Sequence, residues 1–137
     1  DRILDVGCGS GYSTVVLARL ASTVIGLEED AELVRVASDT LGALGVAARV
    51  IQGSLARGCP ADAPYDVMFV NGAMETAPEG LLEQLGEGGR LVGVLRDGPQ
   101  GRANIFLREH GRISSRTDFD SNVPLLPGFQ RPKSFVF

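Results

Sequence analysis

The stretch ILDVGCGSGYSTVVLARL, residues 3–20, decides the fold expected for this chain. Its apolar start predicts a short strand that ends in three glycines at alternate positions, namely Gly7, Gly9 and Gly11. The residues beyond the glycines predict a helix, because apolar side chains recur there at helical spacing. A strand that runs through a glycine-rich turn into a helix brings bare backbone amides and a helix N-terminus close to a ligand. The stretch therefore predicts a site for a nucleotide or a nucleoside.

The spacing of the glycines indicates which ligand is bound. A dinucleotide fingerprint requires a small residue at position 12, where this chain has Tyr12. Asp5 stands two positions before the first glycine, where its carboxylate would repel a phosphate and suit a cation. No Gly-Lys-Ser/Thr follows, which excludes a phosphate-binding loop of the P-loop type. The pattern therefore predicts S-adenosylmethionine, a nucleoside with a positive charge and no phosphate.

The segment STVIGLEED, residues 22–30, predicts a second strand that stops at consecutive acidic residues. A carboxylate at this position of such a fold accepts hydrogen bonds from the two ribose hydroxyls, and we assign that role to Glu28. Glu29 and Asp30 are expected at the start of the next helix, with Glu29 facing solvent and Asp30 capping free amides. The alternative is that all three acids form a solvated helix start.

Four segments resemble class I S-adenosylmethionine-dependent methyltransferases, and within that superfamily the protein-L-isoaspartate O-methyltransferases. They are DVGCGSGY (residues 5–12), the acidic end of the second strand, APYDVMFVNGA (63–73) and LLEQLGEGGRLVGVL (81–95). That family carries a G-x-G-S-G-Y loop and a QL-x-x-GGRLV segment at the matching places, and the resemblance covers residues 2–96. It implies an α/β fold, a Rossmann-like sandwich whose mostly parallel sheet has an antiparallel C-terminal end.

The resemblance also implies a set of cofactor-binding residues. They are Asp5, Gly7, Cys8, Gly9, Ser10, Gly11, Tyr12, Glu28, Glu29, Ser54, Leu55 and Asn71. The amino-acid half of the cofactor is expected against Asp5, Gly7 and Gly9. The adenine is expected between Leu27 or Glu28 and the Ser54–Leu55 turn, where the serine oxygen or the Leu55 amide stands in place of the acid that the family carries.

The sequence favours an oxygen as the methyl acceptor. The Asp/Asn-Pro-Pro-aromatic tetrapeptide of many amino-group methyltransferases is replaced by Asn71-Gly72-Ala73-Met74. A carboxylate acceptor needs no general base. The single histidine, His110, lies in a predicted hairpin turn far from the glycine loop, so no catalytic residue is assigned. The favoured function is carboxyl O-methylation of isoaspartyl residues in damaged protein, which is a repair reaction. The alternatives are a small-molecule O-methyltransferase of the same fold and a non-catalytic protein that binds S-adenosylmethionine.

Length and composition indicate one domain over residues 1–137. A chain of 137 residues with 44% hydrophobic content can bury one core but not two. No apolar run approaches 18 residues, so the sequence predicts no membrane partner. No residues have metal-ligand spacing. The net charge of −4, without a dense basic face, predicts no nucleic-acid partner. Two cysteines without a C-x-x-C pattern suggest the cytoplasm. Because the chain opens on a strand without methionine, we expect an N-terminal truncation, with nothing in the sequence able to close over a site floor at Asn71-Gly72-Ala73.

Alternating strand and helix patterns predict the remaining elements. The first helix is expected to use Val16, Leu17, Leu20 and Ala21 as its apolar residues. The second, residues 30–44, is expected to turn Leu33, Val34, Ala37, Leu41 and Leu44 inward and to close at Gly45. A capping box at Thr76 and Glu79 is expected to start a third helix that ends near Leu85. Further strands are expected at 48–52, 65–70, 90–95, 102–109, 112–119 and 133–137, with a tight turn at His110-Gly111 and a loop at 123–129.

Overall fold

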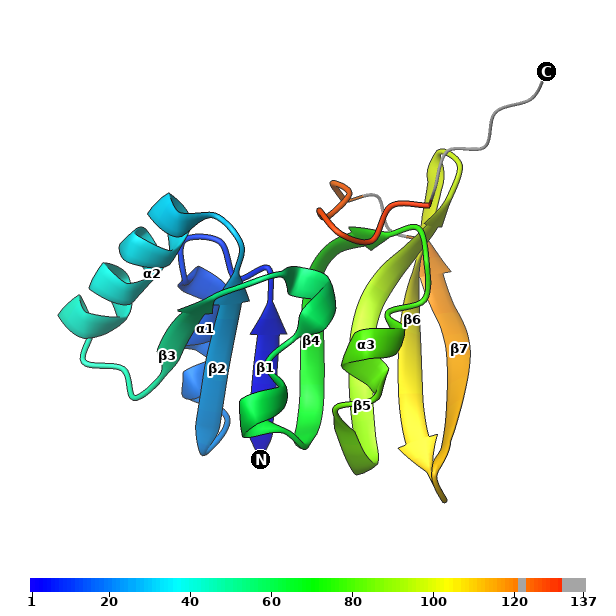
Figure 1. Cartoon of the computed structure of the whole chain (residues 1–137), viewed down its shortest axis with the longest axis horizontal. Coiled ribbons are helices and arrows are strands. Elements are labelled where there is room, and N and C mark those ends of the chain that lie inside the picture. Colours follow the sequence, from blue (N-terminus) through cyan, green and yellow to red (C-terminus); the bar gives the residue numbers. More distant parts are fainter. Residues whose placement is uncertain (121–122, 132–137) are drawn as a thin grey trace.

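The computed structural model describes residues 1–120 and 123–131, which form one seven-stranded sheet flanked by short helices (Figure 1). The strand order is β3-β2-β1-β4-β5-β6-β7. Neighbours from β3 to β5 are parallel, whereas β6 and β7 are antiparallel. The strands are β1 (Arg2–Val6), β2 (Thr23–Glu28), β3 (Arg49–Gln52), β4 (Tyr65–Met74), β5 (Leu85–Asp97), β6 (Gln100–Glu109) and β7 (Arg112–Asp120). The predicted α/β class, with a mostly parallel sheet and an antiparallel C-terminal end, is confirmed.

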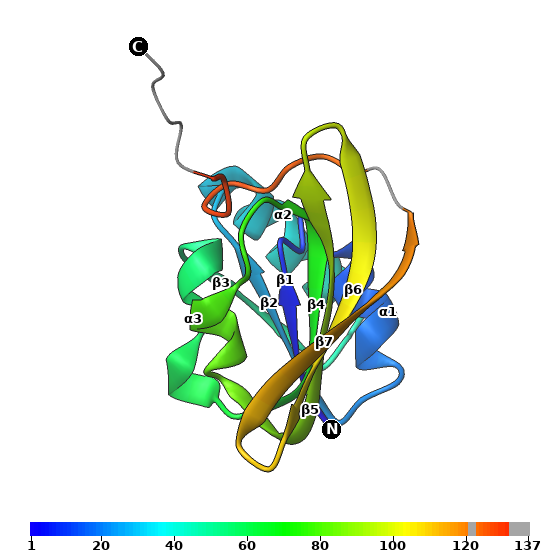
Figure 2. The ribbon, with the colours of Figure 1, turned by 90° about the vertical axis from the view of Figure 1, so that its right-hand side faces the viewer.

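The helices lie on both faces of the sheet. They are α1 (Tyr12–Ala18), α2 (Ala31–Ala43), α3 (Glu79–Leu82) and the two 3-10 turns η1 (Leu55–Arg57) and η2 (Pro60–Asp62). Seen along the sheet, α1 lies on one face, and α3 lies on the opposite face (Figure 2). No helix of the described residues is long and apolar enough to cross a bilayer.

The central strand β1 places the glycine loop at the middle of the sheet. Its residues from Ile3 to Val6 are all buried, because β2 and β4 pair on either side of it and helices cover both faces. The chain leaves β1 toward β2 and β3 on one side and later toward β4 and β5 on the other. Ligands of open α/β sheets bind at such a reversal of strand order, outside the carboxyl ends of the strands. The loop after β1 therefore stands at the expected binding position.

The first helix turns a different face inward from the one predicted. Its buried residues are Thr14 and Val15, whereas Val16 is exposed and Leu20 is 78% exposed beyond the helix end. A hydrogen bond explains this orientation: the Thr14 hydroxyl, on the face toward the sheet, donates to the buried carboxylate of Asp5. Apolar spacing alone does not reveal this bond.

The second helix buries a narrower stripe than predicted. Ala37 and Leu41 are buried as expected and Val34 is half-buried, but Leu33 is exposed and Leu44 is 57% exposed. A Cβ atom on Gly11 would lie 3.0 Å from the Cα atom of Ala37, so the helix approaches the glycine loop very closely at this point. Only the helix residues that align with this contact, Ala37 and Leu41, are buried.

The predicted capping box is wrong. Pro78 occupies the N-cap position of α3, and within the described residues the Thr76 hydroxyl donates to the Phe129 carbonyl (3.4 Å) instead of capping the helix. The helix ends at Leu82, and β5 already starts at Leu85, because Leu85 pairs with Tyr65 before an irregularity in the β4–β5 register. The strand therefore includes the glycine-rich GEGG run that was expected to precede it.

The C-terminal hairpin follows the sequence prediction. His110 and Gly111 have φ angles of 53° and 72°, and β6 and β7 pair across them. The Glu87 carboxylate accepts hydrogen bonds from the amides of both turn residues and ties the hairpin to β5. His110 is exposed, as expected. The strand predicted at 133–137 lies outside the described residues.

Candidate functional site

The glycine loop of residues 7–11 joins the end of β1 to α1, and two of its glycines have distinct roles. Gly9 has a φ of 57°, and a Cβ atom added there would meet no heavy atom within 4 Å, so the loop is open at this point. Gly11 has a φ of 92° and lies against Ala37, where a side chain would collide with α2. The backbone is thus accessible to a ligand at Gly9, whereas Gly11 allows the start of α1 to pack closely against α2.

Asp5 is the buried charge beneath this loop. Its side chain is 0% exposed. Its Oδ2 atom accepts hydrogen bonds from the hydroxyls of Ser13 (2.7 Å) and Thr14 (2.8 Å), and Oδ1 accepts one from Nδ2 of Asn71 (2.5 Å). Donors on three sides stabilise the negative charge away from water. Apolar periodicity did not predict Ser13 and Thr14 as partners, although two hydroxyls at the start of an otherwise apolar helix are a usable signal.

Glu28 lies at the end of β2, as predicted, and its carboxylate reaches the loop. Oε1 accepts a hydrogen bond from the Gly9 amide (3.0 Å), while Oε2 accepts from the amides of Glu29 (2.7 Å) and Asp30 (3.0 Å). The carboxylate therefore ties the glycine loop to the turn that follows β2. Oε2 already accepts two hydrogen bonds, whereas Oε1 accepts one and retains a lone pair for a further donor.

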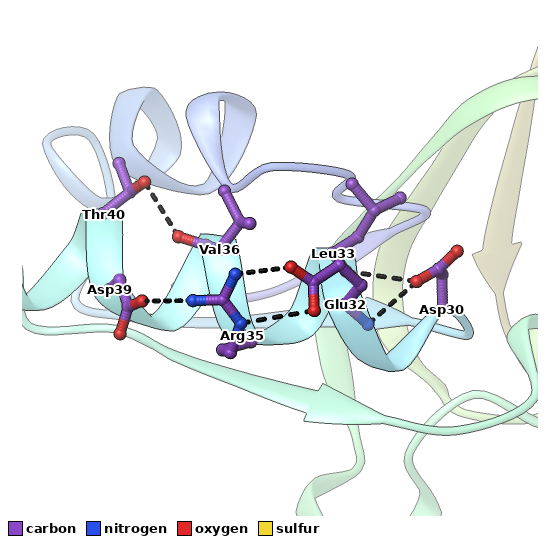
Figure 3. Close-up of polar contacts among 7 residues, drawn as sticks. All are labelled: Asp30, Glu32, Leu33, Arg35, Val36, Asp39 and Thr40. Carbon is purple, nitrogen blue, oxygen red and sulfur yellow. Dashed lines mark hydrogen bonds and ion pairs between the residues drawn. The ribbon is translucent and has the colours of Figure 1, made fainter.

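The start of α2 agrees with the sequence prediction. Oδ1 of Asp30 accepts hydrogen bonds from the amides of Glu32 (2.9 Å) and Leu33 (3.2 Å), which makes Asp30 the N-cap (Figure 3). Within the same helix, Arg35 forms ion pairs with Glu32 and Asp39 (Figure 3). The Glu29 side chain is exposed, as expected. Of the three consecutive acids, Glu28 alone bonds to the glycine loop.

The turn after β3 lies next to Glu28. The Gly53 amide donates to the Glu28 carbonyl (3.0 Å), which brings Ser54 and Leu55 to the same edge of the sheet. Leu55 is buried in the main core, so its side chain faces away from a ligand and only its backbone amide is available. Ser54 is half-buried at the start of η1.

Residues 123–131 reach the ends of β1 and β4, a contact that no local sequence pattern predicted. The Ala73 amide donates to the Pro124 carbonyl (2.8 Å), and the Leu126 amide donates back to the Ala73 carbonyl (2.9 Å). A Cβ atom on Gly72 would lie 2.4 Å from Cγ of Leu126, and one on Gly7 would lie 3.3 Å from Cδ2 of Leu126. The segment crosses above β4 (Figure 1). The expectation that nothing in the sequence could close over Asn71-Gly72-Ala73 is therefore wrong: the two glycines leave the space into which Leu126 packs.

The other predicted loop residues differ in exposure. Tyr12 is 77% exposed at the first turn of α1, and Ser10 is exposed. The Cys8 side chain instead points inward, since its sulfur lies 3.0 Å from the position of a Cβ atom on Gly26. Burial, assisted by the nearby carboxylates of Asp5 and Glu28, raises the pKa of the Cys8 thiol to about 11. Cys8 is therefore a packing residue and offers a ligand its backbone alone.

The raised pKa of Cys8 predicts how stability depends on pH. Because the folded state favours the neutral thiol, its contribution is complete below the ordinary pKa of 9.0 and is lost as the pH rises toward about 11. We expect the free energy of unfolding, measured by urea denaturation, to fall across this window, and to fall less steeply in Cys8→Ala. Burial also raises the pKa of Tyr65, which accounts for a decline that remains in the variant. Identical slopes in the two proteins would contradict the burial of the thiol.

Comparison with known proteins agrees with this geometry. The family model for protein-L-isoaspartate (D-aspartate) O-methyltransferase matches residues 1–124. A protein-L-isoaspartate O-methyltransferase of Methylorubrum populi is 40% identical over 132 residues, which is 93% of this chain and 61% of the relative. A solved structure of the same description superposes with a TM-score of 0.86 at 25% identity, over 93% of this chain and 42% of the other.

A second solved structure shares the fold. It is a Plasmodium falciparum protein described as a β-aspartate methyltransferase, in complex with S-adenosyl-L-homocysteine, with a TM-score of 0.79 at 24% identity. The match covers 91% of this chain and 65% of that protein. The chain spans 53–63% of the length of the first curated relatives that it matches. The extent of the family match and the identity to these relatives show that the chain belongs to the protein-L-isoaspartate (D-aspartate) O-methyltransferase family.

Proposed function

We propose that this chain binds S-adenosylmethionine and belongs to an enzyme that transfers its methyl group to the carboxylate of isoaspartyl residues in proteins. The observation that carries the proposal is the pair of carboxylates, with Asp5 buried beneath a glycine loop that is open at Gly9 and Glu28 bonded to the Gly9 amide. Acidic groups at a loop without a phosphate-binding lysine suit a cationic nucleoside. The family membership supports the same cofactor and reaction.

The residues present fit this cofactor. The absence of a side chain at Gly9 leaves room for a ligand to approach the loop. The free lone pair of Glu28 Oε1 is available to accept a hydrogen bond from a ribose hydroxyl. We assign the adenine side to Ser54 and the Leu55 amide, which lie beside Glu28, and the amino-acid side to Asp5, Gly7 and Asn71. The proposed cofactor site also includes the backbone of Cys8, Ser10, Gly11 and Tyr12, and the exposed side chain of Glu29 at its rim.

When bound, the cofactor supplies an electrophilic methyl group on a sulfonium. The protein's task is then to hold the acceptor in line with that methyl group and to exclude water. An isoaspartyl carboxylate is already a nucleophile, so the chain needs no general base. Leu126, packed against Gly7 and Gly72, forms an apolar wall at the end of β4 where we place the acceptor side.

We propose a protein or peptide substrate with isoaspartyl residues, and no nucleic acid, since the net charge of the chain is −4. Cys8 and Cys59 are buried free thiols, which is compatible with the reducing cytoplasm.

A binding and turnover experiment tests the proposal. By calorimetry, S-adenosylmethionine and S-adenosylhomocysteine are expected to bind at micromolar concentration and NAD not to bind, because Tyr12 and Asp5 disfavour a pyrophosphate. In an assay of the full-length protein, radiolabelled methyl groups should then pass to an isoaspartyl peptide but not to the same peptide with an ordinary aspartate. Tighter binding of NAD would contradict the cofactor assignment. Cofactor binding with methylation of small molecules alone would contradict the acceptor, and binding without any conversion to S-adenosylhomocysteine would indicate a non-catalytic protein.

A further inference from the structure

The strand β7 forms one edge of the sheet, away from the glycine loop (Figure 1). Among the strands of the described residues it pairs with β6 alone, so one side of its backbone is open to a further strand. It has nine residues, whereas β3 at the opposite edge has four. The strand order places β7 four strand spacings from β1, a distance of about 19 Å. This long edge is therefore a surface separate from the proposed cofactor site.

A groove of about 430 Å³ lies beside β7 on the face of the sheet that carries α1. The register runs from Asp5, whose carboxylate bonds to α1, through Ile105 to Arg116, which places these residues on one face. The half-buried side chains of Ile105 and Leu107 form the apolar part of the groove. Its charged lining residues, all exposed, are Arg90, Glu109 and Arg116. The rim on this face is therefore mainly basic.

A second groove, of about 460 Å³, lies on the opposite face between β7 and α3. Leu82 of α3, Phe106 of β6 and Ile113 of β7 form its apolar part. Arg108 also lines this groove, but its Nη2 atom donates to the Leu82 carbonyl (2.7 Å) and is directed toward the helix. The other charged lining residues, both exposed, are Glu79 and Glu83. The rim on this face is therefore mainly acidic.

We infer that β7 binds an extended peptide segment of another protein as an added strand, and that basic and acidic side chains alternate in this segment. Successive side chains of a strand point to opposite faces, so an added strand places every second residue in each groove. A lysine or arginine packs its apolar stem in the groove beside α3 and holds its charge near Glu79 and Glu83. Acidic side chains meet the basic rim of the other groove. Main-chain hydrogen bonds supply the affinity, and the two grooves supply the selectivity.

A second copy of this chain complements the two grooves poorly. Antiparallel pairing of two β7 strands about a two-fold axis keeps each face of the strand on the same side of the joint sheet. On the side of α3, residues 113–117 of β7 present Ile113, Ser115 and Thr117, none of which is charged. On the other side, Arg112 and Arg116 of the second copy would meet a rim that is already basic. A separate peptide of alternating charge therefore fits the edge better than a dimer does.

Peptides with blocked amides test the added strand. Fluorescence anisotropy measures how the full-length protein binds a peptide of about seven residues in which lysine and glutamate alternate. Only alternate amides of an added strand face β7, so N-methylation of one alternate set should abolish binding. Methylation of the other set should change the affinity by no more than about twofold. The unmodified peptide should also slow hydrogen exchange at amides of residues 112–117 and leave the β3 edge unchanged.

Charge variants test the two rims separately. Glu83→Arg and Arg116→Glu should each weaken binding of the alternating peptide about threefold or more, because each replaces an attraction between exposed charges by a repulsion. A peptide with glutamate in place of every lysine should bind Glu83→Arg more tightly than it binds the unmodified protein. Asp39→Arg makes the same change of charge on the exposed surface of α2, and as the matched control it should leave both affinities unchanged.

Several results would overturn the inference. Binding that survives both methylation patterns would exclude an added strand, and equal weakening by Asp39→Arg would exclude recognition by the two rims. Slow exchange of the β7 amides in the free protein would show that the edge is already covered. Such protection would come from a second copy if it rises with protein concentration, and from another part of the same polypeptide if it does not. None of these measurements requires the cofactor, so they leave the proposed function untouched.

Discussion

Asp5→Ala is expected to lower the free energy of unfolding by about 3–5 kcal/mol, because it leaves three donors, among them the buried Thr14 hydroxyl, without their acceptor. Ser13, Thr14 and Asn71 all donate to this carboxylate, and the two hydroxyls and the amide come from different elements. A loss of this size is a large part of the total stability of a small domain. Urea denaturation followed by circular dichroism measures the change.

An exposed carboxylate of the same kind supplies the control. Asp66 accepts a hydrogen bond from the Arg2 amide (2.7 Å) at the opposite end of the sheet, where water can replace the lost partner. Asp66→Ala should therefore cost about 1 kcal/mol or less. If the two variants lost the same stability, the buried network around Asp5 would not have the energetic role that its geometry indicates.

Glu28→Ala is expected to weaken binding of S-adenosylmethionine about tenfold or more, since it removes a charged acceptor from the ribose. It also removes the acceptor of three backbone amides, those of Gly9, Glu29 and Asp30, so the glycine loop loses its tie to the β2–α2 turn. Calorimetry gives the affinity, and thermal unfolding without ligand reports the loosened loop.

Glu29→Ala is the matched control for this prediction. It removes the neighbouring carboxylate, whose side chain is exposed, and leaves the Glu29 amide bonded to Glu28. We expect a much smaller change in affinity. If Glu29→Ala weakened binding as much as Glu28→Ala, the ribose would be held one residue further along the chain than we have placed it.

Local sequence patterns predicted the site elements where the necessary signal lies within a few residues. The strand, the three glycines and the acids at the end of β2 are contiguous in the chain, and the Asp30 cap needs only the amides two and three residues ahead. Local patterns failed at α3, where Thr76 resembled a cap but bonds to the Phe129 carbonyl across 53 residues. A competing partner that is distant in sequence cannot be read from a capping motif.

The sequence by itself determined the strand–loop–helix at the centre of the sheet, the acids beside it and the alternation of strands and helices that makes most of the sheet parallel. These follow from backbone freedom, hydrophobic period and side-chain charge, which are properties of neighbouring residues. The tertiary structure decided what surrounds them. Asn71 reaches Asp5 across 66 residues, and Leu126 fills the space above Gly7 and Gly72, because strand order brings the ends of β1 and β4 together. Contacts of this kind depend on which strands become neighbours, and so they are fixed only when the sheet has formed.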